Sequence, residues 1–545
     1  MNGCIMNYNL SKYNYFLNKA RKLLNQNKIN NSIEFYNFAL NEKPNCITCL
    51  NELGVIYINL AKYNEADKIY SNYIANHAGD FKTFNHYSIV LMRTGRINEA
   101  LYYLDLAYKL NPFCFETLLN LCALNNQIGN LDTAFNFALE AIKVNPTSSL
   151  AHNNLGSVFN SMAMRDEALY SFETALSLDS NNLESYVNIG AIKSSKFDVL
   201  GSIEIYEKAI IKLNKLHNKQ VEIVKYFLSF EYFKNGEIKN GWKYFESGFH
   251  PNIPIKNGRA PRRTFSKPLW NGSSLIDKNI LVWREQGLGD ELMFFSMLPD
   301  LLSIVKNVII EVDGRLVNSF QRSFPNVIVR AQSFGSPPNN ESNFNDFDFH
   351  IPVASLGGYL RSDVDSFKNS KPYIIVDREK KFKFHNRLLN FAGHIKIGIS
   401  WRSGTIDPLR NLTYLSIFDL ECIFSIKNAI FINLQYGDCD EECSAAEIKF
   451  GIKIIRWSDL NLKDDLDDVF SLISELDYVV TVATAVQHMA ASVGAVTLLI
   501  TPRGAWNRFN LDYDPWFSNL HPFVSDSDDL RTVLPNVKYY IESRI

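Results

Sequence analysis

Residues 151–159 read AHNNLGSVF, and this stretch sets the register of a repeat in the first half of the 545-residue chain. Steps of about 34 residues from Gly156, in either direction, reach a small residue each time. These positions are Ala20, Gly54, Ser88, Cys122, Gly156 and Gly190. A second row of small residues is Ser32, Ala66, Ala100, Ala134, Ala168 and Ser202. Close crossing of two helices in every repeat requires such positions, so the spacing predicts a helical solenoid.

A third row and a set of prolines support the same period. The row is Ala39, Tyr73, Ala107, Ala141, Ala175 and Ala209, in which Tyr73 is the exception. Pro44, Pro112 and Pro146 stand where a helix has to end. The pattern resembles tetratricopeptide repeats over residues 11–215. We predict a solenoid over residues 1–250, with about six repeats and a degenerate cap, whose groove binds a partner protein or peptide.

The periodicity changes after this solenoid. Residues 251–278 are rich in Pro, Gly, Ser and Arg and are interpreted as a linker. Beyond them, short apolar runs alternate with amphipathic stretches, which indicates parallel sheets of the doubly wound type. The runs form two groups, residues 279–371 and 392–545, joined by residues 372–391. We therefore expect an α/β domain with two Rossmann-like halves.

Polar motifs follow several predicted strands, where ligands of parallel sheets bind. The first is Arg284–Asp290 (REQGLGD), in which Gly289 leaves room for a ligand. Asp290 is either a helix N-cap or a general base facing the cleft. The second motif is Ser400–Gly404 (SWRSG), followed by Arg410. The hydroxyls of Ser400 and Ser403 and the guanidinium groups of Arg402 and Arg410 suit a diphosphate.

Two further motifs complete the candidate site. In Leu434–Asp438 (LQYGD), Gln435 and Tyr436 either contact a base or ribose or close a turn. In Val482–His488 (VATAVQH), Thr484 and the backbone amides around Ala485 open a helix and suit a phosphate. His488 lies one turn further on the same face, although a single histidine on such a helix is usually structural.

Together these motifs resemble the heptosyltransferase-like glycosyltransferases of family 9, and more closely bacterial proteins that fuse tetratricopeptide repeats to such a domain. The resemblance implies a GT-B-like fold with an N-terminal acceptor half and a C-terminal donor half. It also implies that residues 526–545 form a helix that crosses back to the first half. Asp290 matches the catalytic base, Ser400 and Arg402 match the loop that handles the donor phosphates, and Arg410 matches a nearby basic residue. Thr484 and His488 match an Asp-Thr-Gly-x-x-His motif whose aspartate and glycine are here Ala483 and Ala485.

The resemblance implies an inverting transfer of a sugar from a nucleotide-sugar donor to a protein acceptor held by the solenoid. We expect neither a metal nor another cofactor, because enzymes of this architecture stabilise the leaving diphosphate with helix dipoles and basic side chains. The D-x-D triplets of the chain, such as Asp346/Asp348 and Asp465/Asp467, are interpreted as coincidence. Ala483 leaves an alternative open, in which a non-catalytic scaffold carries a degenerate nucleotide-sugar domain.

Composition and charge argue against several other kinds of partner and site. The formal net charge of −2 favours neither nucleic acid nor an anionic membrane as a partner. No apolar run is long enough to span a bilayer, and the first residues lack a signal-peptide pattern, so we expect a cytoplasmic protein. The pairs Cys46/Cys49 and Cys439/Cys443 have no matching second pair nearby, which favours free thiols over a zinc site.

Overall fold

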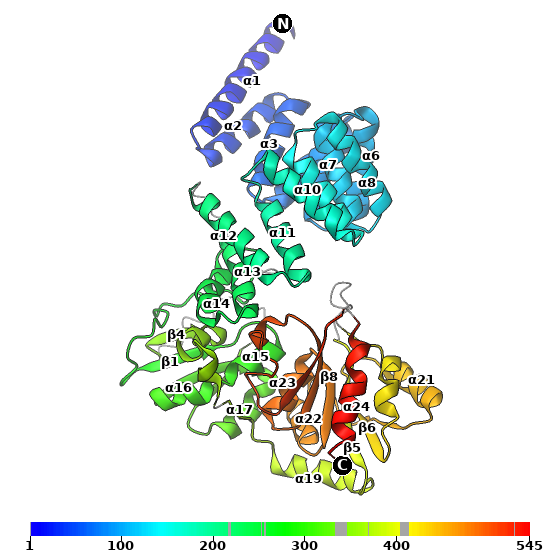
Figure 1. Cartoon of the computed structure of the whole chain (residues 1–545). Coiled ribbons are helices and arrows are strands. Elements are labelled where there is room, and N and C mark those ends of the chain that lie inside the picture. The colour runs from blue at the N-terminus through cyan, green and yellow to red at the C-terminus, as the bar shows by residue number, and fades with distance from the viewer. Residues whose placement is uncertain are drawn as a thin grey trace. The chain divides into compact units, whose positions relative to one another are not determined.

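The computed structural model (Figure 1) describes residues 2–215, 220–251, 253–254, 258–332, 346–368, 370–403, 414–527 and 529–544. The chain divides into two compact units, Met1–Ile192 and Lys193–Ile545. In its described part the first unit consists of helices and their connecting turns, and the second contains helices and two parallel sheets. None of the helices within these ranges is both long and apolar enough to cross a bilayer.

The first unit is built from paired helices that follow the predicted period. They are α1 (Asn2–Asn25), α2 (Ile29–Glu42), α3 (Ile47–Asn59), α4 (Tyr63–Asn76), α5 (Phe81–Arg93), α6 (Ile97–Leu110), α7 (Phe115–Gln127), α8 (Leu131–Val144), α9 (Ser149–Ser161), α10 (Arg165–Leu178) and α11 (Leu183–Ser195). From α3 onward, the first helices of the pairs start about 34 residues apart. A Cβ on Gly156 would lie 2.7 Å from the Phe172 ring, and one on Gly54 would overlap Tyr70. The small residues therefore lie at helix crossings, and the tetratricopeptide-like solenoid is confirmed.

The first helices of the pairs form a continuous row. α3 contacts α5, α5 contacts α7, and α7 contacts α9, in addition to the contacts within each pair. Amide side chains join this row, since Asn51 Nδ2 donates to Thr83 Oγ1 (3.1 Å) and Asn120 Nδ2 donates to Asn85 Oδ1 (2.9 Å). The row thus carries polar amide groups from one repeat to the next along one face of the solenoid.

Three more helices open the second unit, and a four-stranded parallel sheet follows them. The helices are α12 (Val199–Lys215), α13 (Val221–Lys234) and α14 (Ile238–Phe245). The strands are β1 (Asn279–Trp283), β2 (Asn307–Asp313), β3 (Ile328–Gln332) and β4 (Phe349–Pro352), in the order β3-β2-β1-β4. Ile280 pairs with Val308 on one side and with Phe349 on the other. The helices around this sheet are α15 (Leu288–Phe295), α16 (Leu298–Ile304), α17 (Val317–Ser323) and α18 (Gly357–Leu360).

The second sheet has six parallel strands. They are β5 (Ile395–Ser400), β6 (Ala429–Asn433), β7 (Ile454–Ile455), β8 (Tyr478–Val482), β9 (Thr497–Pro502) and β10 (Leu520–Ser525), in the order β10-β9-β8-β5-β6-β7. Its helices are α19 (Arg378–Leu389), α20 (Glu421–Phe424), α21 (Asp440–Phe450), α22 (Leu466–Ile473), α23 (Ala485–Ser492) and α24 (Leu534–Glu542). The alternation of parallel strands and helices in both sheets confirms the predicted α/β class.

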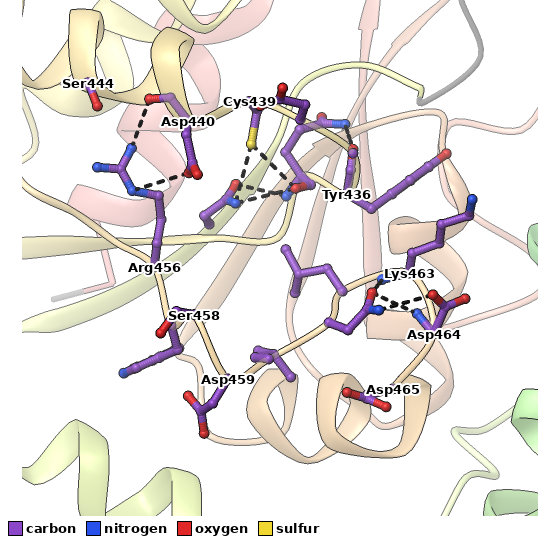
Figure 2. Close-up of a pocket in the computed structure, with 18 residues that line it drawn as sticks. Tyr436, Cys439, Asp440, Ser444, Arg456, Ser458, Asp459, Lys463, Asp464 and Asp465 are labelled. Atoms are coloured by element: carbon purple, nitrogen blue, oxygen red, sulfur yellow. Dashed lines mark hydrogen bonds and ion pairs between the residues drawn. The ribbon is translucent and has the colours of Figure 1, made fainter.

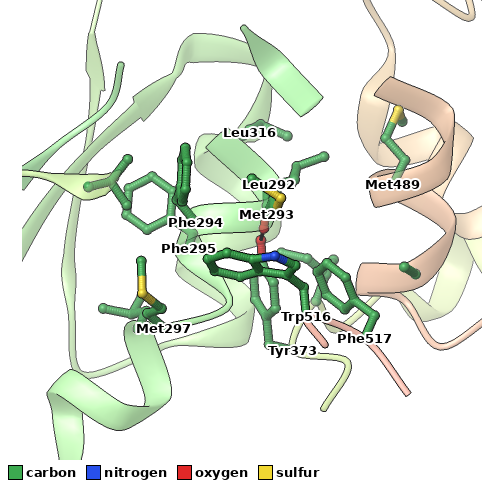
Figure 3. Close-up of a cluster of buried hydrophobic side chains, with 14 of the residues drawn as sticks. Leu292, Met293, Phe294, Phe295, Met297, Leu316, Tyr373, Met489, Trp516 and Phe517 are labelled. Atoms are coloured by element: carbon green, nitrogen blue, oxygen red, sulfur yellow. Dashed lines mark hydrogen bonds between the residues drawn. The ribbon is translucent and has the colours of Figure 1, made fainter. Parts of the chain in front are cut away.

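One apolar core joins the parts of the second unit. It includes Phe233 and Trp242 from α13 and α14, Phe294 from α15, and Met489 from α23. Figure 3 shows part of this core, with Met489 across from the side chains of α15. Burial of these large side chains stabilises the packing of α13 and α14 on the sheets.

Two segments differ from their expected arrangement. Residues 251–278, interpreted as a linker, are packed, because Arg259, Trp270 and Leu275 are buried there. The C-terminal helix α24 forms, but it does not cross back to the first sheet. Val537 and Ile541 place it in the core of the second sheet instead, since an amphipathic helix packs on the nearest apolar surface.

Candidate functional site

Each sheet contains a point where the strand order reverses. In the first sheet it lies between β1 and β4, and in the second between β5 and β8. Ligands of open parallel sheets bind outside the carboxyl ends of the strands at such points. Three of the predicted motifs follow these strands, namely Arg284–Asp290 after β1, Ser400–Ser403 after β5, and the residues from Ala483 to His488 after β8. The topology therefore places the predicted residues where a ligand site is expected.

The loop after β1 turns sharply into α15. Gln286 has a φ of 62°, and Gly287 is the N-cap residue of the helix. The half-buried Asp290 closes a capping box, because its Oδ2 accepts a hydrogen bond from the Gly287 amide at 3.3 Å. Gly287 is therefore the N-cap residue instead of Asp290, which contributes to the capping box from the third position of the helix, and the role of Asp290 as a general base stays a prediction.

The first turns of α15 and α23 approach each other closely at Gly289. A Cβ on Gly289 would lie 3.2 Å from Ala485 Cα and 3.4 Å from His488 Nδ1. Such a distance to backbone is tighter than ordinary van der Waals contact, so the glycine is needed for this approach. The unpaired amides at the start of each helix, with the positive ends of both helix dipoles, are thereby brought together.

His488 is buried at this junction and is uncharged. Burial lowers its pKa from 6.5 to about 4, and the Gly289 backbone opposes this shift. Its Nε2 lies 3.0 Å from Gln487 Nε2, so the amide donates to the ring and the ring proton resides on Nδ1. The Gly289 backbone faces that Nδ1, and Gln487 Oε1 is buried without a hydrogen-bond partner among the described residues. Thr484, 9% exposed, precedes them without capping the helix.

The polar side chains at the ends of β5 and β6 are arranged differently. Gln435 is fully buried, and its Oε1 accepts the amides of Trp401 (3.1 Å) and Arg402 (3.0 Å) and the Ser400 hydroxyl (3.4 Å). This geometry corresponds to the turn-closing interpretation of Gln435. The Ser403 hydroxyl lies 3.4 Å from the Tyr436 hydroxyl.

Arg402 is paired within the protein. Its guanidinium forms an ion pair with Glu442 of α21 and donates to the Asp438 carbonyl at 3.0 Å. The side chains of this loop that were predicted to bind a diphosphate are therefore engaged in contacts within the chain itself. Arg410, the remaining predicted basic residue, lies outside the described residues.

A cavity of about 1030 Å³ opens beside this loop (Figure 2). Gln435 and Tyr436 form one wall, and the segment Arg456–Asp465 between β7 and α22 forms another. Its charged lining residues are Asp438, Asp440, Asp459, Asp464, Asp465, Arg456 and Lys463. Carboxylates predominate, so the cavity suits hydroxyl-rich groups better than phosphates. Sequence reasoning found Gln435 and Tyr436 but missed Arg456–Asp465, although the apolar run ending in Arg456–Trp457 marks a strand end.

A buried ion-pair network that the sequence did not reveal supports the loop after β1. Arg259 and Glu285 are both completely buried and form an ion pair. Arg259 also pairs with Glu246 (2.8 Å) and donates to the Ser355 hydroxyl (2.9 Å), and it stacks 4.1 Å from the Phe249 ring centre. Burial of two charges is tolerated only when they are paired and hydrogen-bonded, as here. The network holds the loop at the residue before Gln286.

A second buried pair fixes α15. Arg284 Nε lies 2.7 Å from Glu291 Oε2, and Glu291 Oε1 accepts the Asp313 amide at 2.7 Å. Burial raises the pKa of Glu291 to about 7, and Arg284 opposes this shift. Because Glu291 follows Asp290 directly, this pair sets the position of the first turn of α15.

Among the described residues, no group of His, Cys, Asp and Glu side chains is arranged to hold a metal ion. The seven cysteines whose side chains are described are free thiols, including Cys439 and Cys443 near the cavity.

Comparisons with known proteins give a relative in sequence and partial likeness to solved repeat structures. No protein-family model matches the chain. Protein FlbA of Caulobacter vibrioides is 26% identical over 416 residues, which cover 74% of this chain and 68% of that protein. Two solved structures resemble part of the present chain. A tetratricopeptide repeat protein from Parabacteroides merdae covers 45% of this chain and 95% of its own, with 15% identity and a TM-score of 0.39. YrrB, described as a TPR protein with an unusual peptide-binding site, covers 31% of this chain and 88% of its own, with 22% identity and a TM-score of 0.28.

Proposed function

We propose that the chain is a glycosyltransferase that moves a sugar from a nucleotide-sugar donor to a protein acceptor, by an inverting, metal-independent mechanism on a GT-B-like pair of sheets. The observation that carries the proposal is the junction of α15 and α23. Two helix starts from the reversal points of two parallel sheets meet there, beside the buried imidazole of His488. Convergent donors of this kind suit an anionic leaving group.

The leaving diphosphate would bind at this junction. Backbone amides of the first turn of α23 and the imidazole of His488 would donate to its oxygens, and the helix dipoles would stabilise the charge that develops as the sugar departs. A neutral histidine supplies a hydrogen bond without a counter-charge. Arg402 would add a positive charge once it leaves Glu442, with which it is paired at present.

The nucleoside of the donor would occupy the cavity of about 1030 Å³. Carboxylates such as Asp464 are acceptors for ribose hydroxyls, and Trp457 offers an aromatic surface for a base. The same carboxylates repel phosphate, which favours the helix starts as the diphosphate position.

Asp290 would take the proton of the acceptor hydroxyl. Its carboxylate, which accepts the Gly287 amide in the folded protein, would act as the base. A protein acceptor would bind along the solenoid, because repeats of this kind present an extended concave surface to a partner.

Calorimetric titration with a panel of nucleotide sugars, followed by a transfer assay with the bound donor, tests the proposal. We expect His488→Gln to weaken donor binding at least tenfold, with exposed His394→Gln as the matched control. Asp290→Asn should bind the donor normally but lose turnover at least about 100-fold, with Asp365→Asn at the surface as its control. Full turnover by a folded Asp290→Asn protein would contradict the mechanism.

A second candidate function is a non-catalytic scaffold with a degenerate nucleotide-sugar domain. It is favoured by Ala483, which stands where the resemblance implies an aspartate, and by the internal engagement of Arg402 and Gln435. Donor binding without turnover in the wild-type protein would support this candidate. Absence of donor binding by a well-folded protein would contradict the glycosyltransferase proposal.

A further inference from the structure

A second cavity, of about 520 Å³, lies where α14 meets β4 and α18, and its walls are mainly apolar. The Trp270 and Tyr359 rings lie 4.7 Å apart at one side, and Trp242 lines the same cavity. The indole N–H groups of Trp242 and Trp270 already donate to backbone carbonyls, both at 2.8 Å. Tyr359 and Leu269 are 45% and 51% exposed, so large apolar side chains face solvent at the rim. Such a concentration of exposed apolar surface is typical of a binding site.

The free charge of this cavity is positive. Lys239 and Lys243 line it one helical turn apart on α14, both are exposed, and neither forms an ion pair with a carboxylate in the described part of the chain. The cavity's single acidic residue, Glu246, is paired with Arg259 and accepts the Ser355 hydroxyl at 2.6 Å. Arg259 is shared between Glu246 and Glu285, so a ligand at this site meets two ammonium groups and one carboxylate, and the cavity keeps a net positive charge.

We propose that this cavity binds an acidic peptide segment of a partner protein. A large apolar side chain of the peptide enters beside Trp270, Tyr359 and Leu269, and neighbouring carboxylates pair with Lys239 and Lys243. The volume lies in the range of a specific pocket and holds one or two side chains. An aromatic anchor surrounded by charged contacts is the usual composition of a protein-binding hot spot. This inference goes beyond the proposed function and does not depend on catalysis.

The site also lies next to the network that supports the loop after β1. Glu246 and Ser355 line the cavity and both contact Arg259, which pairs with Glu285. A bound peptide thus lies at the edge of the first sheet. Arg259 links Glu246 in the wall of the cavity to Glu285, the residue that precedes Gln286.

Fluorescence anisotropy with the full chain tests the proposal. The probes are fluorescein-labelled heptapeptides that carry one Phe, Trp or Leu between pairs of Asp or Glu. We expect saturable binding that weakens with salt. Lys239→Glu/Lys243→Glu should raise the Kd at least about tenfold, whereas the matched charge change Lys306→Glu/Lys453→Glu at exposed positions should alter it less than about twofold.

The apolar half of the site has its own test. Leu269→Ala/Tyr359→Ala should weaken binding at least about fivefold, and replacing the central Phe of the probe by Ala should then have little further effect. Circular dichroism checks that each variant is folded, and Lys239→Gln/Lys243→Gln replaces the charge reversal if that protein unfolds. Absence of saturable binding by every probe, equal loss in the control variant, or displacement of the probe by maltoheptaose would overturn the proposal.

Discussion

The ends of β8 and β5 carry similar predicted ligands but differ in how their polar atoms are satisfied. At the end of β8, Gln487 Oε1 is buried without a partner among the described residues. At the end of β5, Gln435 bonds the backbone of Trp401 and Arg402, and Arg402 pairs with Glu442. The two strands are neighbours in the sheet, so the difference does not come from their general position.

The contrast distinguishes ligand positions from structural positions. A buried polar atom without a partner costs about 1–3 kcal/mol, so it persists where something other than the protein completes it. Atoms that already close a turn contribute to the fold instead. On this argument the β8 side is the stronger part of the proposed site, and the β5 side supplies its framework.

The largest effect should follow from removing Gln435. Gln435→Leu leaves the amides of Trp401 and Arg402 buried without an acceptor, so we expect a loss of about 2–4 kcal/mol in unfolding free energy. Urea unfolding followed by tryptophan fluorescence measures this loss. Gln321→Leu, at an exposed glutamine with a single backbone bond, is the control and should change the free energy by less than about 1 kcal/mol. Equal losses of unfolding free energy in the two variants would contradict a structural role for Gln435.

The next effect concerns His488 and acid. Burial lowers its pKa from 6.5 to about 4, so below pH 6.5 the unfolded chain binds a proton that the folded protein does not. This histidine therefore makes the wild type lose stability as pH falls from 6.5 toward 4, by at most about 1.4 kcal/mol per pH unit. His488→Gln should lack this part of the pH dependence. The pKa of His350 is also lowered to about 4 by burial. Because this residue is present in both proteins, its contribution cancels in the difference between their unfolding free energies.

The measurement is the difference in unfolding free energy between wild type and His488→Gln at several pH values in that window. Exposed His394→Gln should follow the wild-type curve. Parallel curves for wild type and His488→Gln would show that His488 is not held neutral in the fold.

The junction of α15 and α23 and the framework at the end of β5 also differ in how well the sequence predicts them. The repeats were predictable because helix crossings at Gly54 and Gly156 impose a spacing that the sequence preserves. The motifs were predictable because the carboxyl ends of parallel strands meet at one edge. The sequence left Gln435 open between turn closure and ligand contact, since that choice depends on which loop lies opposite. It did not reveal the Arg259–Glu285 pair, whose partners come from distant segments and meet only after folding.

A smaller effect distinguishes two neighbouring glycines. Gly289→Ala places a Cβ 3.2 Å from Ala485 Cα, so α15 and α23 must separate by a few tenths of an ångström. We expect a loss of about 1–2 kcal/mol in stability and, if the proposed site is correct, weaker nucleotide-sugar binding. Gly287→Ala is the matched control, because its Cβ would lie 3.5 Å from Asp290 Oδ2 in ordinary contact. Calorimetry and urea unfolding of both variants test the pair, and identical behaviour would contradict a close junction.

The smallest effect on stability, and the sharpest test of the contrast, concerns the Arg402–Glu442 pair. The two side chains are 25% and 38% exposed, so Glu442→Gln should change the unfolding free energy by less than about 1 kcal/mol. The same substitution releases the guanidinium, which can then turn toward a diphosphate at the start of α23. We therefore expect Glu442→Gln to tighten nucleotide-sugar binding about threefold and Arg402→Ala to weaken it by a similar factor. If calorimetry finds the same affinity in both variants as in the wild type, Arg402 belongs to the framework with Gln435, and the junction of α15 and α23 alone holds the diphosphate.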